Sequence, residues 1–186
     1  AHHGIWAPGV RLFRELRFTA KALVISLAFM LPMLGLLGWT LESEADLALQ
    51  ARLNATRQHV EVVHGLLAWA QAQEAGGSLT REQAQQMALR AVAALRYDGS
   101  GHFWISDMQS RMLMHPLTPE LESRRLGEPK DAAGHAPLDA FVATVRKDGK
   151  GFVTHRWPEP GSAQAQDQVT YVMGFAPWGW VLGAGV

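Results

Sequence analysis

Hydrophobic residues form one long uncharged run near the start of the chain and recur periodically after it. The run from Ala22 to Leu41 holds no charged residue, and its length matches the roughly 20 residues that cross the hydrocarbon of a bilayer as a helix. A signal peptide is the alternative, but its apolar core has only about 7–15 residues. The sequence therefore predicts one transmembrane helix, residues 22–41.

Charged residues on the two sides of this run differ in sign. Mostly basic residues precede it and acidic residues follow it directly: Arg11, Arg14, Glu15, Arg17 and Lys21 come before, and Glu42, Glu44 and Asp46 come after. Because an excess of Lys and Arg marks the cytoplasmic side of a membrane protein, we expect residues 1–21 in the cytoplasm. Residues 42–186 then lie outside the inner membrane, in the periplasm.

Residues 42–74 lack proline and carry a heptad pattern that is typical of a long helix. Apolar or small residues alternate in steps of four and three: Leu49, Leu53, Thr56, Val60, Val63, Leu67 and Ala70. A second stripe, Val62, Leu66 and Trp69, widens the apolar face. A helix that only covers its own sheet explains one stripe, whereas a second copy of the chain explains both. The pattern therefore predicts one long helix, and a homodimer through it is a hypothesis.

A second helix is expected after the glycine pair Gly76-Gly77, which ends the first. Thr80 and Gln83 have the spacing of a capping box, in which the hydroxyl and the side-chain amide satisfy first-turn amides. We expect this helix over residues 80–96. Its predicted core face consists of Ala84, Met87, Ala88, Ala91 and Leu95.

Beyond residue 97 the hydrophobic period changes from that of a helix to that of strands. The expected strands are His102–Asp107, Arg111–His115, Gly151–Trp157, Val169–Phe175 and Trp180–Val186, with a short helix over Pro137–Lys147 and loops at Pro116–Ala136 and Pro158–Asp167. Helices followed by antiparallel strands and one crossing helix describe an α+β domain with helices packed on one sheet. We predict one outer domain, residues 42–186, with the sheet and crossing helix in 97–186.

Composition and charge exclude several classes of function. Residues 42–186 carry a small excess of acidic over basic residues, so no basic field is available for a nucleic acid. The chain contains no Cys, which removes disulfides, thiolate metal sites and cysteine nucleophiles. Neither a nucleophile elbow, a zinc-protease helix nor a phosphate-binding glycine loop occurs in it. We therefore expect no enzyme, no catalytic residue, no metal and no cofactor.

Several short motifs, in a fixed order over residues 80–186, resemble the single Cache sensor domains of bacterial chemoreceptors and related membrane receptors. They are Leu95-Arg96-Tyr97-Asp98-Gly99, Phe103-Trp104-Ile105 with Asp107, Met112, Met114-His115-Pro116, Pro119-Glu120-Leu121, Lys130-Asp131 with Gly134, Gly149-Lys150-Gly151-Phe152-Val153, Trp157-Pro158, Pro160-Gly161, Tyr171-Val172, Phe175, Pro177-Trp178-Gly179-Trp180-Val181, Gly183 and Gly185-Val186. The predicted span and long helix stand upstream of these motifs, where the family has them.

The resemblance implies a PAS-like antiparallel sheet with a long N-terminal helix, displayed in the periplasm between two membrane spans. Such a domain binds a small metabolite, often a short organic acid. Downstream, related receptors carry a second span and a signalling module. A methyl-accepting chemotaxis receptor is the expected whole protein, and a sensor histidine kinase or a diguanylate cyclase is the alternative.

Eight residues are the candidates for ligand contact. Polar donors for a small anion are Tyr97, His115, Lys130 and Tyr171, apolar walls are Phe103, Met114 and Trp178, and Trp104 with His115 forms the expected centre. Burying a carboxylate requires such donors, because an unpaired charge loses several kcal/mol on leaving water. Lys130 is included because it coincides with the Lys-Asp pair of the resembling family.

Each candidate also has an interpretation without a ligand. His115, which precedes Pro116, has the alternative role of hydrogen-bonding a turn, and Tyr97 that of a core aromatic with its hydroxyl at the rim. Strand alternation places His102, Trp104 and Ser106 on one face, but the sequence does not say which face opens to ligand. Three function classes follow: a ligand sensor, a dimerisation or partner-binding module, and a membrane-anchored enzyme.

Overall fold

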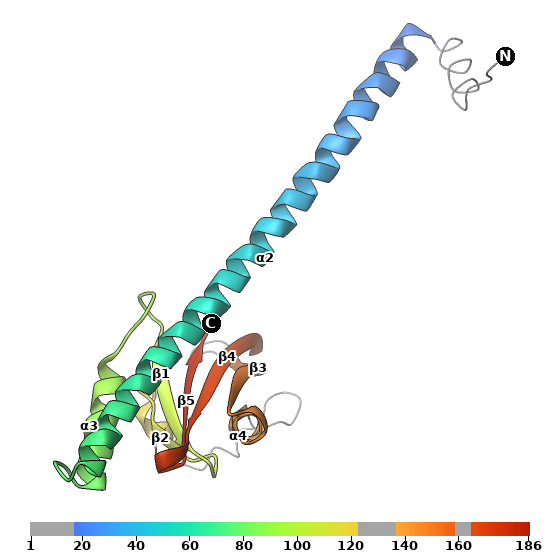
Figure 1. Ribbon diagram of the computed structural model, residues 1–186. Coiled ribbons are helices and arrows are strands. Elements are labelled where there is room, and N and C mark those ends of the chain that lie inside the picture. The colour runs from blue at the N-terminus through green and yellow to red at the C-terminus, as the bar shows by residue number, and fades with distance from the viewer. Residues whose placement is uncertain (1–16, 123–136, 159–164) are drawn as a thin grey trace. The chain divides into compact units, whose positions relative to one another are not determined.

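A computed structural model describes residues 17–122, 137–158 and 165–186 of the chain (Figure 1). Its elements are, in chain order, α2 (Phe18–Ala75), α3 (Arg81–Ala94), β1 (Phe103–Asp107), β2 (Met112–Met114), the 3-10 turn η1 (Pro119–Leu121), α4 (Pro137–Asp148), β3 (Lys150–Pro158), β4 (Ala165–Phe175), the 3-10 turn η2 (Ala176–Trp178) and β5 (Trp180–Gly185). The strands form one five-stranded sheet in the order β2-β1-β5-β4-β3, and all the paired strands run antiparallel. The predicted α+β class with a long N-terminal helix is confirmed.

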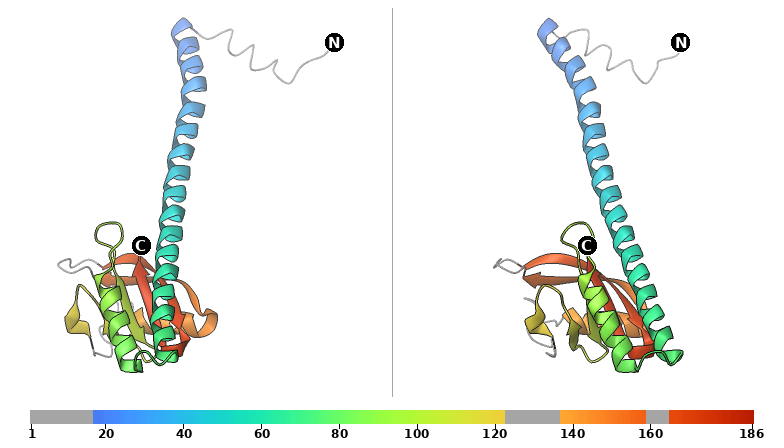
Figure 2. Two further views of the ribbon diagram at one scale, coloured as in Figure 1. Left: turned by 60° about the vertical axis from the view of Figure 1, so that its left-hand side comes forward. Right: turned by 90° about the vertical axis from the view of Figure 1, so that its left-hand side faces the viewer.

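Helices α2 and α3 cover one face of the sheet, as both views of Figure 2 show for α3 and the part of α2 beside it. The side chains that α2 buries there are Thr56, Val60, Val63, Leu67 and Ala70. All five belong to the predicted heptad seam, because a helix can bury only one stripe against a flat sheet. Leu49 of the same seam is 48% exposed, and the compact unit that contains the sheet begins only at Ala51.

Helix α3 begins as its sequence predicts. The hydroxyl of Thr80 accepts a hydrogen bond from the Gln83 N–H, and the Gln83 side chain accepts one from the Thr80 N–H. Its core face is formed by Ala84, Ala88 and Val92. The prediction that Leu95 belongs to this face is wrong, since the helix ends at Ala94 and Leu95 is an extended cap residue that is 37% exposed.

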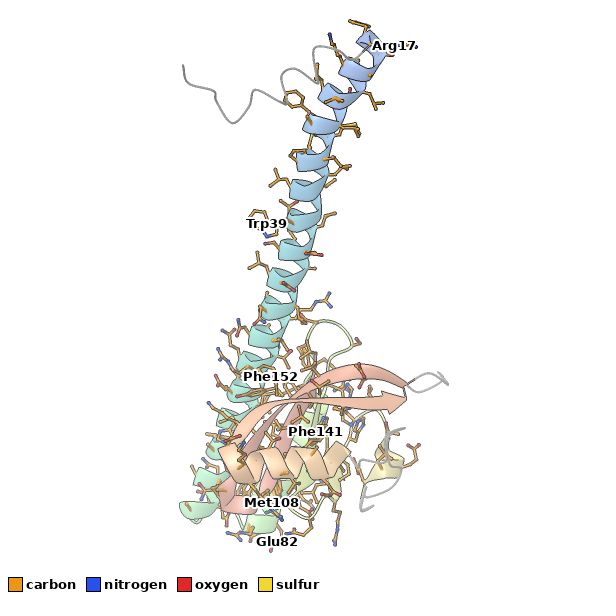
Figure 3. All side chains as sticks on the ribbon, turned by 90° about the vertical axis from the view of Figure 1, so that its right-hand side faces the viewer. Arg17, Trp39, Glu82, Met108, Phe141 and Phe152 are labelled. Atoms are coloured by element: carbon orange, nitrogen blue, oxygen red, sulfur yellow. The ribbon has the colours of Figure 1, made fainter. Side chains whose placement is uncertain are left out.

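Helix α4 lies across the opposite face of the sheet, as Figure 3 shows with Phe141 labelled on it. A second buried cluster forms beneath it: Trp104, Met112, Leu138, Phe141, Val142, Val145, Val153, Val172 and Val181. The sheet therefore separates two cores, which we call the α2 side and the α4 side. Because successive residues of a strand point to opposite faces, neighbours such as Phe103 and Trp104 belong to different cores.

A bulge in the β1–β2 pair interrupts the side-chain alternation of β2. Ile105 pairs with Met114 and Ser106 pairs with Met112, so one extra residue of β2, Leu113, stands between the two pairs. A bulge of this kind shifts the side-chain alternation of its strand. Met112 consequently joins the α4 side and Met114 the α2 side, although an uninterrupted strand would place residues two positions apart on the same face.

The β3–β4 hairpin is longer than the sequence indicates. The predicted loop Pro158–Asp167 is wrong in part, because β3 runs to Pro158 and β4 begins at Ala165. The ladder pairs Arg156 with Asp167 and Pro158 with Ala165. The polar residues that begin β4 carry no strand signal of their own, and pairing with β3 makes them extended.

The N-terminal part of α2 contains one segment that is long and apolar enough to span a membrane. Its most apolar 18-residue window has a mean hydropathy of 2.1, and no share of that window is buried. It is the one such helix among the residues described. The predicted span, residues 22–41, falls inside α2.

Candidate ligand site on the α4 side of the sheet

Trp104 is fixed between the sheet and helix α4. Its indole lies over Gly183 of the neighbouring strand β5, where a Cβ atom would overlap ring atoms of Trp104. On its other side the ring stacks on Phe141 of α4, with 5.1 Å between ring centroids and 27° between ring planes. Glycine is needed at 183 because any side chain would occupy the volume of the indole. Trp104 is 7% exposed.

Three polar side chains lie among the apolar residues on the α4 side of the sheet: Ser106, His155 and Thr170. Ser106, two residues after Trp104 on the same face, is fully buried, and its hydroxyl has no hydrogen-bond partner among the described residues. On β3 and β4, the His155 Nε2 atom lies 2.9 Å from the Thr170 hydroxyl, and the His155 ring meets Phe141 edge-on at 5.0 Å. Buried polar atoms are normally satisfied, so the Ser106 hydroxyl is a candidate partner for a polar ligand atom.

The N-terminal end of α4 is fixed to the β1–β2 turn. The Ser110 hydroxyl donates a hydrogen bond to the Asp139 carboxylate at 2.5 Å, and Ser110 is 5% exposed. At the other end of α4, the Arg146 guanidinium donates to the Met108 carbonyl oxygen at 3.0 Å. These two contacts set the position of Phe141 over Trp104.

His102 and His115 form a second polar group near the start of β1. Their rings meet edge-on with centroids 5.0 Å apart. The His115 Nδ1 atom accepts a hydrogen bond from the Thr118 N–H at 3.1 Å, and the His115 N–H donates to Glu122 Oε1 at 3.1 Å. His115 thus closes the turn after β2, which is the role that the sequence left open as its alternative.

Burial favours the neutral form of both imidazoles. Burial, with a smaller contribution from His102, lowers the pKa of His115 to about 4, and burial also lowers the pKa of His102. In the unfolded chain a His has a pKa of about 6.5. Because the unfolded state binds more protons below that pH, the stabilisation by neutral His115 is complete above pH 6.5 and is lost as the pH falls.

We therefore expect the free energy of unfolding to decrease from pH 6.5 toward pH 4. A His115→Asn variant should have a shallower dependence, because the Asn oxygen can accept from Thr118 but does not titrate. Urea unfolding of both proteins at pH 4.5, 5.5, 6.5 and 7.5 checks this. Parallel curves for the two proteins would contradict it.

The structure separates the seven predicted ligand residues that it describes. Trp104 lies on the α4 side, and His115 contacts His102, which alternation along β1 assigns to the same side. Phe103, Met114, Tyr171 and Trp178 lie in the core under α2 and α3, with Tyr97 packed against that core. Lys130 lies outside the described residues. The seven described candidates therefore lie on two different faces of the sheet.

Most of the predicted ligand residues on the α2 side have structural partners. The Tyr97 hydroxyl donates to the Gly185 carbonyl oxygen, and burial raises the pKa of Tyr97 to about 12. The Trp178 indole N–H donates to the Glu74 carboxylate at 2.7 Å. Tyr171 packs on Phe152 with 4.7 Å between centroids; its buried hydroxyl is unpartnered within residues 17–122, 137–158 and 165–186. Most of this group holds the α2 side together.

Sequence reasoning missed Phe141, His155 and Thr170 as members of the site. Alternation along β3 from the buried Val153 assigns His155 to the same face, and the register pairs Val153 with Thr170. The alternation of Val153 and His155 can be read from the sequence. The register that brings Thr170 beside Val153 cannot, because it depends on how β3 pairs with β4. Phe141 enters the site only because α4 crosses the sheet above Trp104.

A hollow of about 600 Å³ opens elsewhere on the same side, between the β1–β2 turn and α4. Its walls are Met108, Gln109, Ser110, Asp139, Val142, Ala143, Arg146 and Lys147. Arg146 and Lys147 are exposed, and the hollow includes none of the eight predicted ligand residues. We place the candidate site at Trp104 instead, because small-molecule sites combine buried apolar walls with a few buried polar groups.

Within the part of the chain that the structure describes, no group of three or more His, Asp or Glu side chains is arranged to hold a metal ion. The candidate site offers indole, imidazole and hydroxyl donors instead. Such donors match the oxygen atoms of a small polar or anionic molecule.

Comparison with known proteins identifies the family. The profile of Single Cache domain 2 matches residues 48–186. The chain belongs to the single Cache domain 2 family. As expected from the resemblance in its motifs, this is a family of sensor domains of chemoreceptors, which are not enzymes.

A full-length relative of this Cache domain agrees with the assignment. The methyl-accepting chemotaxis protein McpP of Pseudomonas putida is 43% identical over 164 residues, which cover 88% of this chain and 30% of McpP. The chain thus spans about a third of the length of that relative.

Two solved structures have a similar fold. One, described as the structural basis for carboxylic acid recognition by a Cache chemosensory domain, is 42% identical, with a TM-score of 0.69 over 74% of this chain and 93% of that one. The other is the periplasmic sensor domain of a chemotaxis protein, 41% identical, with a TM-score of 0.70 over 74% of this chain and 96% of that one. Both belong to chemosensory domains, so this chain has the fold of a ligand sensor.

Proposed function

We propose that this Cache domain is the periplasmic sensor of a transmembrane chemotaxis receptor and that it binds a small carboxylic acid on its α4 side. The observation that carries the proposal is the similarity to a Cache domain that recognises carboxylic acids, at 42% identity. McpP, a methyl-accepting chemotaxis protein, supports the receptor assignment. The buried polar groups around Trp104 are the proposed partners of the carboxylate.

The proposed site pairs an apolar wall with hydroxyl and imidazole donors. Trp104 and Phe141 provide the wall, and Ser106 and the Thr170–His155 pair provide the polar groups. A carboxylate that gives up water needs such donors to compensate for the hydration energy it loses. We propose that the alkyl part of the acid contacts the edges of these two rings.

The proposal includes the membrane and a second copy of the chain. We propose that residues 22–41 cross the inner membrane, with residues 1–21 cytoplasmic and the domain of residues 42–186 periplasmic. Val62 and Trp69 of α2 are 74% and 53% exposed, so the second apolar stripe remains available to a second copy. A monomeric mass in sedimentation of the detergent-solubilised chain would contradict the dimer.

Calorimetric titration tests the ligand and the site together. Acetate, propionate, butyrate and succinate are titrated into the purified chain, with alanine and adenine as non-matching compounds. We expect saturable binding of at least one acid. The absence of binding by all four acids would contradict the proposed function.

Two isosteric variants then locate the site. Thr170→Val removes a buried hydroxyl on the α4 side and should weaken acid binding by about tenfold, the equivalent of one hydrogen bond near 1.4 kcal/mol. Tyr171→Phe is the matched control, because it removes a buried hydroxyl from the adjacent residue on the α2 side. It should leave affinity unchanged. The reverse pattern would assign the ligand to the α2 side.

A further inference from the structure

Gly174, near the end of β4, is contacted from both sides of the sheet. Its N–H donates to the Gly149 carbonyl oxygen at 2.9 Å, next to the first ladder pair of β3 and β4, Lys150 with Met173. The Gly149 N–H does not return this bond, since it donates to Val145 at the end of α4. The Gly174 carbonyl oxygen therefore lacks its ladder partner from β3 and needs another donor.

Helix α2 provides that donor. The His64 Nε2–H donates to the Gly174 carbonyl oxygen at 3.2 Å, 110 residues away in the chain. The same imidazole meets Phe175 edge-on at 5.3 Å. Gly174 is thus the point at which the backbone of the sheet is tied to α2 by a directional bond.

Helix α4 meets the same residue from the other face. A Cβ atom at position 174 would lie 2.5 Å from the Val145 Cγ1 atom, so Val145 packs directly on bare backbone. Val145 is 9% exposed and follows Phe141 by one helical turn. Because residues four apart share one helix face, Phe141 on Trp104 and Val145 on Gly174 move together when α4 moves.

We propose that Gly174 is a relay between α4 and α2, through which a ligand at Trp104 changes the position of α2. This inference rests on the proposed function. A ligand that contacts Trp104 and Phe141 displaces α4, Val145 transfers the displacement to the Gly174 backbone, and the His64 hydrogen bond transfers it to α2. Close-packed interiors transmit such shifts because they hold no free space to absorb them. The ligand acts only by its different affinity for the two arrangements.

Variants of His64 separate the hydrogen bond from packing. His64→Leu removes the donor and keeps an apolar side chain against Phe175, whereas His64→Gln keeps a donor. Glu61→Gln is the matched control, because it weakens another link between α2 and the sheet, the Glu61–Lys150 ion pair at 3.4 Å, which does not involve Gly174. None of these residues belongs to the candidate ligand site.

Spin labels measure the movement. The chain has no native Cys, so labels at Ala68→Cys on α2 and Lys147→Cys on α4, both exposed, report one distance in the full chain in nanodiscs. Addition of a saturating acid, chosen among acetate, propionate, butyrate and succinate by calorimetry, should shift this distance in the wild-type background, in His64→Gln and in Glu61→Gln. His64→Leu should lose at least half of the shift, with acid affinity kept within roughly threefold.

Three results of this experiment would contradict the relay. One is a full shift in His64→Leu, and another is an acid that binds the wild-type background without moving the labels. A shift that Glu61→Gln loses as completely as His64→Leu would also contradict it, since any link to α2 would then suffice.

If no acid binds, the proposed function is refuted but the relay is not. A measurement without ligand then still tests the relay. The urea midpoints of Val145→Ala, His64→Leu and the double variant form a thermodynamic cycle. Independent sites have additive effects. We expect the Val145–His64 pair to be non-additive and the pair of Val145→Ala with Glu61→Gln to be additive. Additivity of the Val145–His64 pair would refute the relay.

Discussion

Gly183→Ala is expected to lower the free energy of unfolding and to abolish high-affinity acid binding. The added Cβ atom would overlap the Trp104 indole, which cannot retreat because Phe141 stacks on its other face. Inserting one carbon into a closely packed core costs about 1–3 kcal/mol. The displaced indole also loses its place as the wall of the proposed site. Urea unfolding and calorimetry with the acids named above measure the two effects.

Gly185→Ala is the control for this experiment. Gly185 lies on the same strand, two residues away and on the same face, but a Cβ atom there meets nothing within 4 Å, and the residue is not in the left-handed backbone region. Its unfolding free energy and its acid affinity should match those of the unmodified chain. An equal loss in both variants would show that strand β5, and not the Trp104 contact, is sensitive to substitution.

Leu67→Ala is expected to cause the largest loss of stability on the α2 side. Leu67 is fully buried and belongs to the cluster that joins α2 and α3 to the sheet. Removing a buried leucine side chain costs about 2–5 kcal/mol, depending on how well the cavity closes. A single urea transition at a lower midpoint is expected, because α2 from Ala51 onward belongs to the same compact unit as the sheet.

Val62→Ala provides the comparison on the same helix. Val62 is 74% exposed, and a surface substitution of this kind changes stability by less than about 0.5 kcal/mol in a monomer. Equal losses for Leu67→Ala and Val62→Ala would contradict the assignment of the two stripes. A loss in Val62→Ala that grows with protein concentration would favour the proposed contact with a second copy.

Local signals in the sequence predicted the helices well. The heptad seam identified each α2 side chain that is buried, because periodicity alone decides which stripe of a helix can face a sheet. Thr80 and Gln83 identified the start of α3, since a capping box is complete within four residues. The run from Ala22 to Leu41 identified the candidate span by length and composition.

Long-range pairing limited what the sequence could predict about the strands and the site. Phe103 and Trp104 are adjacent aromatics of one strand, and only the packing of α2 on one face and α4 on the other assigns them to different cores. The bulge at Leu113 reversed the face of the residues after it. Both effects depend on contacts between segments distant in the chain, which periodicity does not record.

The sequence by itself determined the family, the α+β class, the long helix and its buried stripe, because these depend on local periodicity and on motif order. Only the tertiary structure decided the composition of the candidate site. Trp104, Phe141, His155 and Thr170 come from four separate elements, and they meet because α4 crosses the sheet above Gly183 and Gly174. Close approach of a helix to bare backbone is a property of the packed fold, and no local pattern encodes it.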